Sequence, residues 1–258
     1  MLSLEEISRY YPPSLHPFKR NILREYLQHK ILDCIYGSPY ANQLIFMGGT
    51  ALRILHEHTR FSEDLDFDNR GITPESMDLL ADIIQRYLER EGYEIEIKTI
   101  YKTAYHCHIR LPKLLYDYGL SGMPEEKILI QLDAEPQRVE YTPEKKFLNR
   151  FDVFTQINVV PLPTLLSQKI YAAFNCKRLM GRDFYDILFL WPKTQPDYEY
   201  LDHKLHISTP EQLKKYLVNS IKSVDFISLS KDLEPFVFTP KDAQRIIYFP
   251  EWVNSLVF

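Results

Sequence analysis

Hydrophobic and polar positions follow a helical period in several long stretches of this chain. Between residues 18 and 36, apolar side chains recur at the spacing of one helix face, and Gly37 ends the pattern. A second helix is predicted to begin with Thr73 as its N-cap and Pro74 in its first turn. It runs to about residue 91, where Gly92 stops it.

Shorter segments favour strands. Residues 44–47 are apolar, and residues 64–68 alternate polar with apolar, which is typical of a strand with one wet face. Residues 127–133 are nearly all apolar and are expected inside a sheet. Two further segments, residues 93–100 and 105–111, are predicted to pair with each other. We expect loop and edge structure in residues 134–160.

The second half of the chain favours helices. One is predicted from Pro161 to about Leu179, another from about Arg182 to Leu190, and residues 192–258 are expected to be helical and irregular. The pattern therefore predicts an α+β fold, with a mixed β-sheet flanked by helices in residues 1–160 and a helical C-terminal domain in residues 161–258.

Composition narrows the class of protein. The formal charge of −4 over 258 residues excludes a chain that binds nucleic acid through its overall charge, so such a partner needs a local basic patch. Basic residues of the first long helix could steer RNA, although a solvated helix face is the ordinary explanation: Lys19, Arg20, Arg24 and Lys30. Three cysteines without a C-x-x-C pair favour a reducing cytoplasm. No apolar run approaches the ~20 residues of a membrane helix, and the acidic start is unlike a signal peptide.

The strongest candidate chemistry lies around two aspartates and a glycine turn. Asp64 and Asp66 project from one face of the predicted strand, where their mutual repulsion calls for a cation such as Mg²⁺. Gly48 and Gly49 allow close approach of the backbone to a ligand, and Thr50 adds a hydroxyl at the start of a helix that favours anions. Each motif alone is also an ordinary turn or a solvated strand face, but their order and spacing favour a site.

Asp133 is the third candidate acid. It closes the apolar segment 127–133, and a buried carboxylate needs a partner. If its strand lies beside that of Asp64 and Asp66, the three acids could hold metal or activate an attacking hydroxyl. A carboxylate facing water at a strand end is the alternative.

A second cluster follows residue 164. Lys169 shares a helix face with small and apolar residues, which fits a snorkelling surface lysine or a cation aimed at phosphate. Asp183 could hold Lys169 or an arginine in place, although helix capping also explains an acid there. Arg178 and Arg182 could contact phosphates or Asp183.

Taken together, these motifs resemble the AbiEii/AbiGii-type nucleotidyltransferase toxins of the DNA polymerase β-like nucleotidyltransferase superfamily. The resemblance covers residues 44–191: the Gly48-Gly49-Thr50 turn, the block from Arg60 to Phe67, and Lys169 with the later arginine and aspartate residues. It implies that Asp64 and Asp66 bind metal and that Gly48, Gly49 and Thr50 hold a triphosphate. It also implies that Lys169 contacts phosphates beside Asp183 and that the C-terminal domain completes the active site, and it adds Arg60 and Ser62 as candidate substrate contacts. Thr50 stands where the superfamily often has serine.

The resemblance further implies an activity. Such a protein moves a nucleoside monophosphate from a nucleoside triphosphate onto an acceptor hydroxyl, in some members on tRNA, as the toxin of a bacterial toxin–antitoxin or phage-defence system. Mg²⁺ is then the expected cofactor, and RNA and an antitoxin protein are the expected partners. The alternatives are a non-catalytic nucleotide- or RNA-binding module on the same fold, and phosphoryl transfer onto a protein.

Overall fold

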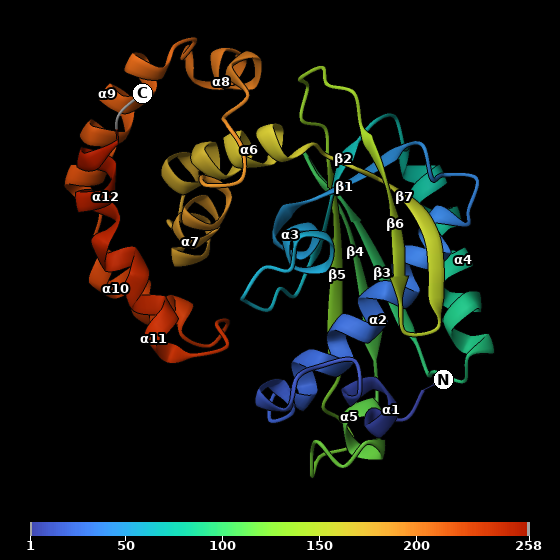
Figure 1. Ribbon diagram of the computed structural model, residues 1–258. Helices are drawn as coiled ribbons and strands as arrows, with labels where there is room; N and C mark the ends of the chain where they lie inside the picture. Colours follow the sequence, from blue (N-terminus) through green and yellow to red (C-terminus); the bar gives the residue numbers. More distant parts are fainter. Residues whose placement is uncertain (1, 257–258) are drawn as a thin grey trace. The chain divides into compact units, whose positions relative to one another are not determined.

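The alternating segments assemble into one seven-stranded sheet in a computed structural model that describes residues 2–256 (Figure 1). The strand order is β3-β4-β5-β2-β1-β7-β6. Two neighbouring pairs, β2 with β5 and β1 with β7, are parallel, and the others are antiparallel, so the sheet is mixed as predicted. The strands are β1 (Leu44–Met47), β2 (Leu65–Asn69), β3 (Glu96–Tyr101), β4 (Tyr105–Leu111), β5 (Ile128–Glu135), β6 (Glu144–Arg150) and β7 (Val153–Val159).

Contacts divide the chain into two units. The first contains the sheet and consists of the residues up to Glu57, Ser62–Gln137 and Pro143–Val159. The second consists of His58–Phe61, Arg138–Thr142 and the residues from Val160 onward. The pattern of the sequence predicted one boundary near residue 160, without these two short segments. The first of them is tied into its unit by backbone, because the Phe61 N–H donates to the Phe236 carbonyl at 2.8 Å.

Helices accompany the sheet of the first unit. α2 contacts β7 and also α4, which in turn contacts β3 (Figure 1). Thr73 caps α4 as predicted, accepting a hydrogen bond from the Ser76 N–H, and Gly92 follows its end with a φ of 93°. The helices of this unit are α1 (Leu4–Ser8), η1 (Pro13–Leu15), α2 (Lys19–Tyr36), α3 (Gly48–His56), α4 (Pro74–Arg90) and α5 (Leu114–Asp117).

The two faces of the sheet differ in polarity. Phe46 of β1 lies opposite Phe67 of β2 and Val159 of β7, and all three are buried in the apolar layer. Because side chains alternate along a strand, the other face receives the residues between them. That face carries Asp66 and, one strand away, Asp133. β5, predicted from its apolar residues to lie inside the sheet, is confirmed as an interior strand between β4 and β2.

Residues 134–160 were predicted as loop and edge structure, and this is wrong in part. β6 and β7 form a regular antiparallel hairpin, in which β6 is an edge strand but β7 pairs with β1 inside the sheet. The two-residue turn contains Phe151 with a φ of 58°, a conformation that usually signals glycine or asparagine. Tertiary contacts hold Phe151 instead, since its ring centroid lies 4.8 Å from that of Tyr10 and 4.9 Å from that of His29.

The second unit is helical, as expected. α6 ends at Asn175, earlier than predicted, and α7 begins at Gly181. A β-carbon at Gly181 would lie 2.2 Å from the Leu229 carbonyl oxygen, so α7 packs directly against α10. No helix within residues 2–256 combines the length and apolarity needed to cross a membrane. The helices are α6 (Leu162–Asn175), α7 (Gly181–Leu190), α8 (Tyr198–Leu205), α9 (Pro210–Ser220), η2 (Ile221–Ser223), α10 (Phe226–Leu233), α11 (Pro240–Ala243), η3 (Gln244–Tyr248) and α12 (Phe249–Ser255).

Candidate functional site

The glycine turn and the aspartate strand meet at Gly48. Met47, the last residue of β1, pairs with Asp66 of β2, and Gly48 follows with a φ of 77°. A β-carbon built at Gly48 would lie 2.1 Å from the Asp66 Oδ2 atom. Glycine is therefore required twice, for its backbone conformation and for the space that the carboxylate occupies. The predicted proximity of Asp66 to the glycine turn is confirmed.

The start of α3 lies at the same point. The helix begins at Gly48, so its first N–H groups, those of Gly48, Gly49 and Thr50, belong to the turn beside Asp66. Such N–H groups favour an anion, which is consistent with the expected phosphate contact. The Thr50 hydroxyl has another use in this structure: it is fully buried and donates a hydrogen bond to the Asp64 carbonyl oxygen. Thr50 thereby ties the start of α3 to the start of β2.

Asp133 lies directly beside Asp66. The two residues are register partners on the parallel strands β2 and β5, so their side chains project from the same face. The Asp133 carboxylate contacts His106 of β4, with 2.6 Å between Oδ1 and Nδ1, and accepts hydrogen bonds from the Gln131 amide at 2.8 and 3.0 Å. The sequence alone does not predict that His106 lies beside Asp133, because that contact depends on the pairing of β4 with β5. The local sequence indicates only that residues 105–108 alternate as in a strand.

Asp68 continues the row of acids but is used structurally. Its carboxylate accepts hydrogen bonds from the Arg70 Nε–H and the Gln137 N–H, each at 2.8 Å, and the residue is buried. It therefore anchors the end of β2, while Asp64 and Asp66 lie nearer the glycine turn.

The chemistry of these donors suits a hard divalent cation. Within residues 2–256, no three or more His, Cys, Asp and Glu side chains are grouped so as to hold a metal ion. Magnesium does not require such a cage, since it is commonly bound by one or two carboxylates, water and substrate phosphates. Asp66, pressed against the glycine turn, and Asp64 at the head of the same strand offer that kind of ligand.

The second unit holds a separate ionic cluster. Lys169 of α6 forms ion pairs with Asp183 and Asp186 of α7, each at 2.9 Å. This confirms the predicted contact between Lys169 and Asp183. The side chains of Lys169 and Asp183 are each 14% exposed, and that of Asp186 is fully buried. Burial alone would lower the pKa of Lys169, but the two carboxylates outweigh it and raise that pKa.

Asp186 is the centre of the cluster. It accepts hydrogen bonds from Arg60 through Nε at 2.7 Å and a terminal nitrogen at 2.6 Å. Burial would raise the pKa of Asp186, but Arg60 and Lys169 hold it well below its usual range. Arg60, expected to contact substrate, is only 2% exposed here and also donates to the Phe61 carbonyl oxygen.

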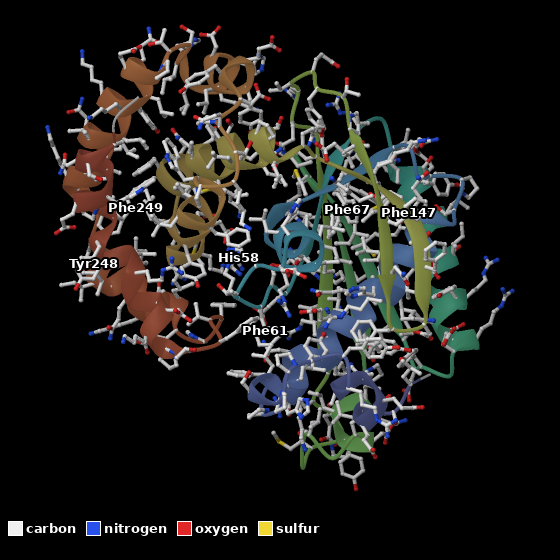
Figure 2. The ribbon with its side chains drawn as sticks, viewed as in Figure 1. His58, Phe61, Phe67, Phe147, Tyr248 and Phe249 are labelled. Atoms are coloured by element: carbon white, nitrogen blue, oxygen red, sulfur yellow. The ribbon has the colours of Figure 1, made fainter. Side chains whose placement is uncertain are left out.

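His58, which is labelled in Figure 2, completes the same cluster from the short segment His58–Phe61. Its Nδ1 accepts from the Thr59 N–H at 2.8 Å, so Nε2 carries the proton and donates to Asp186 at 2.8 Å. The ring stacks on Tyr185 and Phe189 at centroid distances of 5.2 and 4.0 Å. Burial lowers the pKa of His58 to about 4. Neither His58 nor Asp186 was among the predicted site residues, because neither shows its partner in the local sequence.

The other predicted contacts are placed as follows. Arg178 pairs with Asp232 at 3.2 Å on an exposed surface, and the Arg182 guanidinium lies 4.9 Å from the centre of the Phe236 ring. In the first unit, the Ser62 carbonyl oxygen accepts a hydrogen bond from the Gln28 amide at 3.1 Å. Of the helix α2 cations, Arg24 pairs with Glu63 and Lys30 is buried between Glu91 and Asp152, so they are used inside the unit. The alternative that these helix residues steer RNA gains no support from these pairs.

Comparison with known proteins connects this geometry to a family. Residues 30–237 match the family model described as the nucleotidyl transferase AbiEii toxin of type IV toxin–antitoxin systems. A search of curated proteins gives no match. JHP933 from Helicobacter pylori is similar in fold, with a TM-score of 0.54 and 17% identity over 91% of both chains. A second H. pylori structure, provisionally described as a nucleotidyltransferase, gives a TM-score of 0.55 and 17% identity over 91% of this chain and 94% of the other. The structural likenesses show the fold, and the family match over most of the sequence shows that this chain belongs to the AbiEii toxin family and is a nucleotidyltransferase.

Proposed function

We propose that the protein transfers a nucleoside monophosphate from a nucleoside triphosphate to a hydroxyl of RNA, and that the edge of the sheet at Gly48 is its active site. The observation that carries this proposal is the contact between Gly48 and the Asp66 carboxylate. A carboxylate beside the N–H groups of a helix start can hold a divalent cation while those N–H groups face the anion that the cation carries. A metal-bound triphosphate offers both charges.

The residues then have distinct roles. Asp64 and Asp66 hold Mg²⁺, and the N–H groups of Gly48 and Gly49 face the phosphates. When bound, the ion neutralises the charge that develops on the phosphoryl oxygens. Asp133 and His106 form a hydrogen-bonded pair one strand away, and we assign to this pair the acceptance of the proton from an attacking hydroxyl. Lys169 is proposed to act on phosphates, with Asp183 orienting its ammonium group.

The substitution Asp66→Ala tests the assignment. Transfer of labelled nucleotide to total RNA in the presence of Mg²⁺ should fall by about 100-fold or more, the cost of losing one strong electrostatic contact in a transition state. Asp82→Ala is the matched control, because Asp82 is an exposed acid of α4 that pairs only loosely with Arg86 at 3.8 Å. The fold of both variants is checked by circular dichroism and thermal unfolding.

The product distinguishes this activity from its alternatives. Mass spectrometry of the acceptor should show an added nucleoside monophosphate, whereas an added phosphate alone would indicate phosphoryl transfer. Full activity in a folded Asp66→Ala variant would refute the active site. Binding of nucleotide without any product would favour the non-catalytic module.

The biological role follows from the family. We propose that the chain acts as the toxin of a toxin–antitoxin pair, since the matching family is described in those terms. Induction of the wild-type protein should arrest bacterial growth, Asp66→Ala should not, and co-expression of a neighbouring antitoxin gene should relieve the arrest. Transfer RNA is the acceptor that we expect to find labelled.

A further inference from the structure

The β6–β7 hairpin exposes two aromatic rings. Phe147 is 61% exposed and Phe154 is 69% exposed, and their rings stack at a centroid distance of 5.5 Å with planes 13° apart. Phe147 is labelled on the hairpin in Figure 2. Val159 of β7 belongs to the apolar face of the sheet. Phe154 lies an odd number of residues from Val159, and Phe147 pairs with Gln156, which also lies an odd number of residues from it. Strand alternation therefore places both rings on the opposite face, the one that carries Asp66. Adjacent exposed aromatic side chains mark a contact surface more often than isolated ones do.

A cavity of about 350 Å³ borders the same strand. It is lined by residues of α2, the end of α3 and β6, including Phe147. Leu148 and Arg150 alternate with Phe147 along β6, so their side chains project from the opposite face of this edge strand. The polar and charged residues that line the cavity are His29, Arg53, Glu57, Lys146, Asn149 and Arg150. The volume is in the range of small-molecule sites and would admit a nucleobase.

Two buried polar atoms of this lining have no hydrogen-bond partner among the described residues. His29 is fully buried, and its Nδ1 lies 2.6 Å from the Glu25 carbonyl oxygen, so Nδ1–H donates and Nε2 is left as an acceptor. Arg150 Nε is the second such atom, and it is a donor. Burial lowers the pKa of His29 to about 4, which keeps the imidazole neutral near pH 7. A ligand that satisfies both atoms must offer a donor and an acceptor.

The charges around the cavity argue against a simple anion. Arg53 is paired with Glu25 at 2.8 Å, and Lys146 with Glu144 at 2.9 Å. Arg150 donates to the Tyr10 carbonyl oxygen at 2.8 Å, and Glu57 adds a carboxylate to the same lining. A neutral group with polar edges therefore fits better than a free phosphate. The edge of a nucleobase has this character.

We propose that the hairpin and the adjoining cavity bind single-stranded RNA that passes round the edge strand β6, with one base stacked on Phe147 and Phe154 and a later base offering its polar edge to His29 and Arg150. This rests on the proposed function only for the identity of the strand as the acceptor. Two strands, β1 and β7, separate β6 from β2, so at ~4.8 Å per strand the strand of Phe147 lies ~14 Å across the sheet from the Asp66 strand, and the strand of Phe154 lies ~10 Å from it. A few nucleotides of single strand would cover that distance.

Binding can be tested apart from catalysis. Fluorescently labelled ten-nucleotide RNAs of A, C or U are titrated with the protein without nucleoside triphosphate or divalent metal, and anisotropy gives Kd. Phe147→Leu and Phe154→Leu should each weaken binding by about 10-fold, the loss of one base–aromatic stack. Phe147→Trp should preserve affinity, because it keeps an aromatic face. Tyr116→Leu, at an exposed aromatic of α5, is the matched control and should bind as the wild type does.

The cavity has its own readout. The ¹⁵N resonance of His29 Nε2 should shift when the oligonucleotide is added and should stay in place with inorganic phosphate alone. A shift caused by phosphate would overturn the base-reading role, and unchanged Kd values in both leucine variants would overturn the stacking role. Absence of RNA binding together with self-association that Phe147→Leu abolishes would identify a protein interface instead and also refute the proposal.

The outcomes separate this inference from the proposed function. If the wild-type protein binds RNA through Phe147 but transfers no nucleotide, the RNA-binding surface is supported and the proposed function is refuted. If Phe147→Leu transfers nucleotide to RNA as fast as the wild type at RNA concentrations below Kd, the proposed function is supported and the RNA-binding surface is refuted.

Discussion

Each of the three predicted acids is positioned by a residue from a different element. Gly48 leaves room for the Asp66 carboxylate, Thr50 holds the backbone of Asp64, and His106 contacts the Asp133 carboxylate. The first two relations could be predicted, because the glycine turn and the aspartates lie close together in the sequence. The third could not, because it depends on the register between β4 and β5, which no local pattern encodes.

Gly48→Ala should remove the activity by displacing Asp66. The new β-carbon would overlap the carboxylate at 2.1 Å, and it would also strain a backbone with a φ of 77°. Gly92→Ala is the matched control, because Gly92 has a φ of 93° but nothing within 4 Å of the added carbon. Both variants should lose about 1 kcal/mol or more of unfolding free energy from strain, and Gly48→Ala alone should lose about 100-fold in nucleotide transfer. Equal activity of the two variants would contradict the role of the contact.

At the scale of elements, local chemistry determined which segments could be predicted. The start of α4 is encoded by Thr73 and Pro74 and its end by Gly92, and all three act where the sequence places them. The β6–β7 hairpin lacks such signals. Its turn uses Phe151 where glycine is usual, and two exposed phenylalanines occupy the outward positions that a polar residue normally marks. Packing of Phe151 against Tyr10 and His29 replaces the missing local preference, and packing cannot be read from the segment alone.

The pairing of α6 with α7 depends on Lys169. Lys169→Met should lower the free energy of unfolding by about 3 kcal/mol, because it leaves Asp183 and Asp186 mostly buried with one cation fewer. Chemical denaturation monitored by fluorescence measures the loss. In the double variant with Asp183→Asn, part of that stability should return, since the uncompensated charge is removed.

The double variant also tests whether Lys169 has a role in the reaction. If Lys169 acts on phosphates, nucleotide transfer should remain low even where stability is recovered. Recovery of activity together with stability would show that Lys169 serves the structure of the second unit only. Ile97→Met, at a half-buried position of β3, provides a control for the methionine side chain.

At the scale of the whole molecule, each unit contains one buried neutral histidine among residues 2–256. His29 lies in the first unit beneath Phe151, and His58 lies in the second between Tyr185 and Phe189. Burial lowers the pKa of both to about 4, against an ordinary value of 6.5. In the unfolded chain both imidazoles would take up a proton near pH 6.5, whereas in the folded chain they resist it until about pH 4.

Acid should therefore destabilise both units over the same pH window. Because the unfolded state binds more protons between pH 6.5 and 4, the free energy of unfolding falls as pH falls, by about 3 kcal/mol for each histidine across the window. The lowered pKa of Asp186 adds a loss only below its ordinary value of 3.8, outside this range. Urea denaturation at pH 7.5, 6.0, 5.0 and 4.5 measures the slope. His58→Gln keeps an amide donor toward Asp186 but cannot titrate, so it should remove about half of the slope at the cost of ring stacking at every pH. A slope unchanged in His58→Gln would mean that the imidazole of the second unit is not held neutral by its burial.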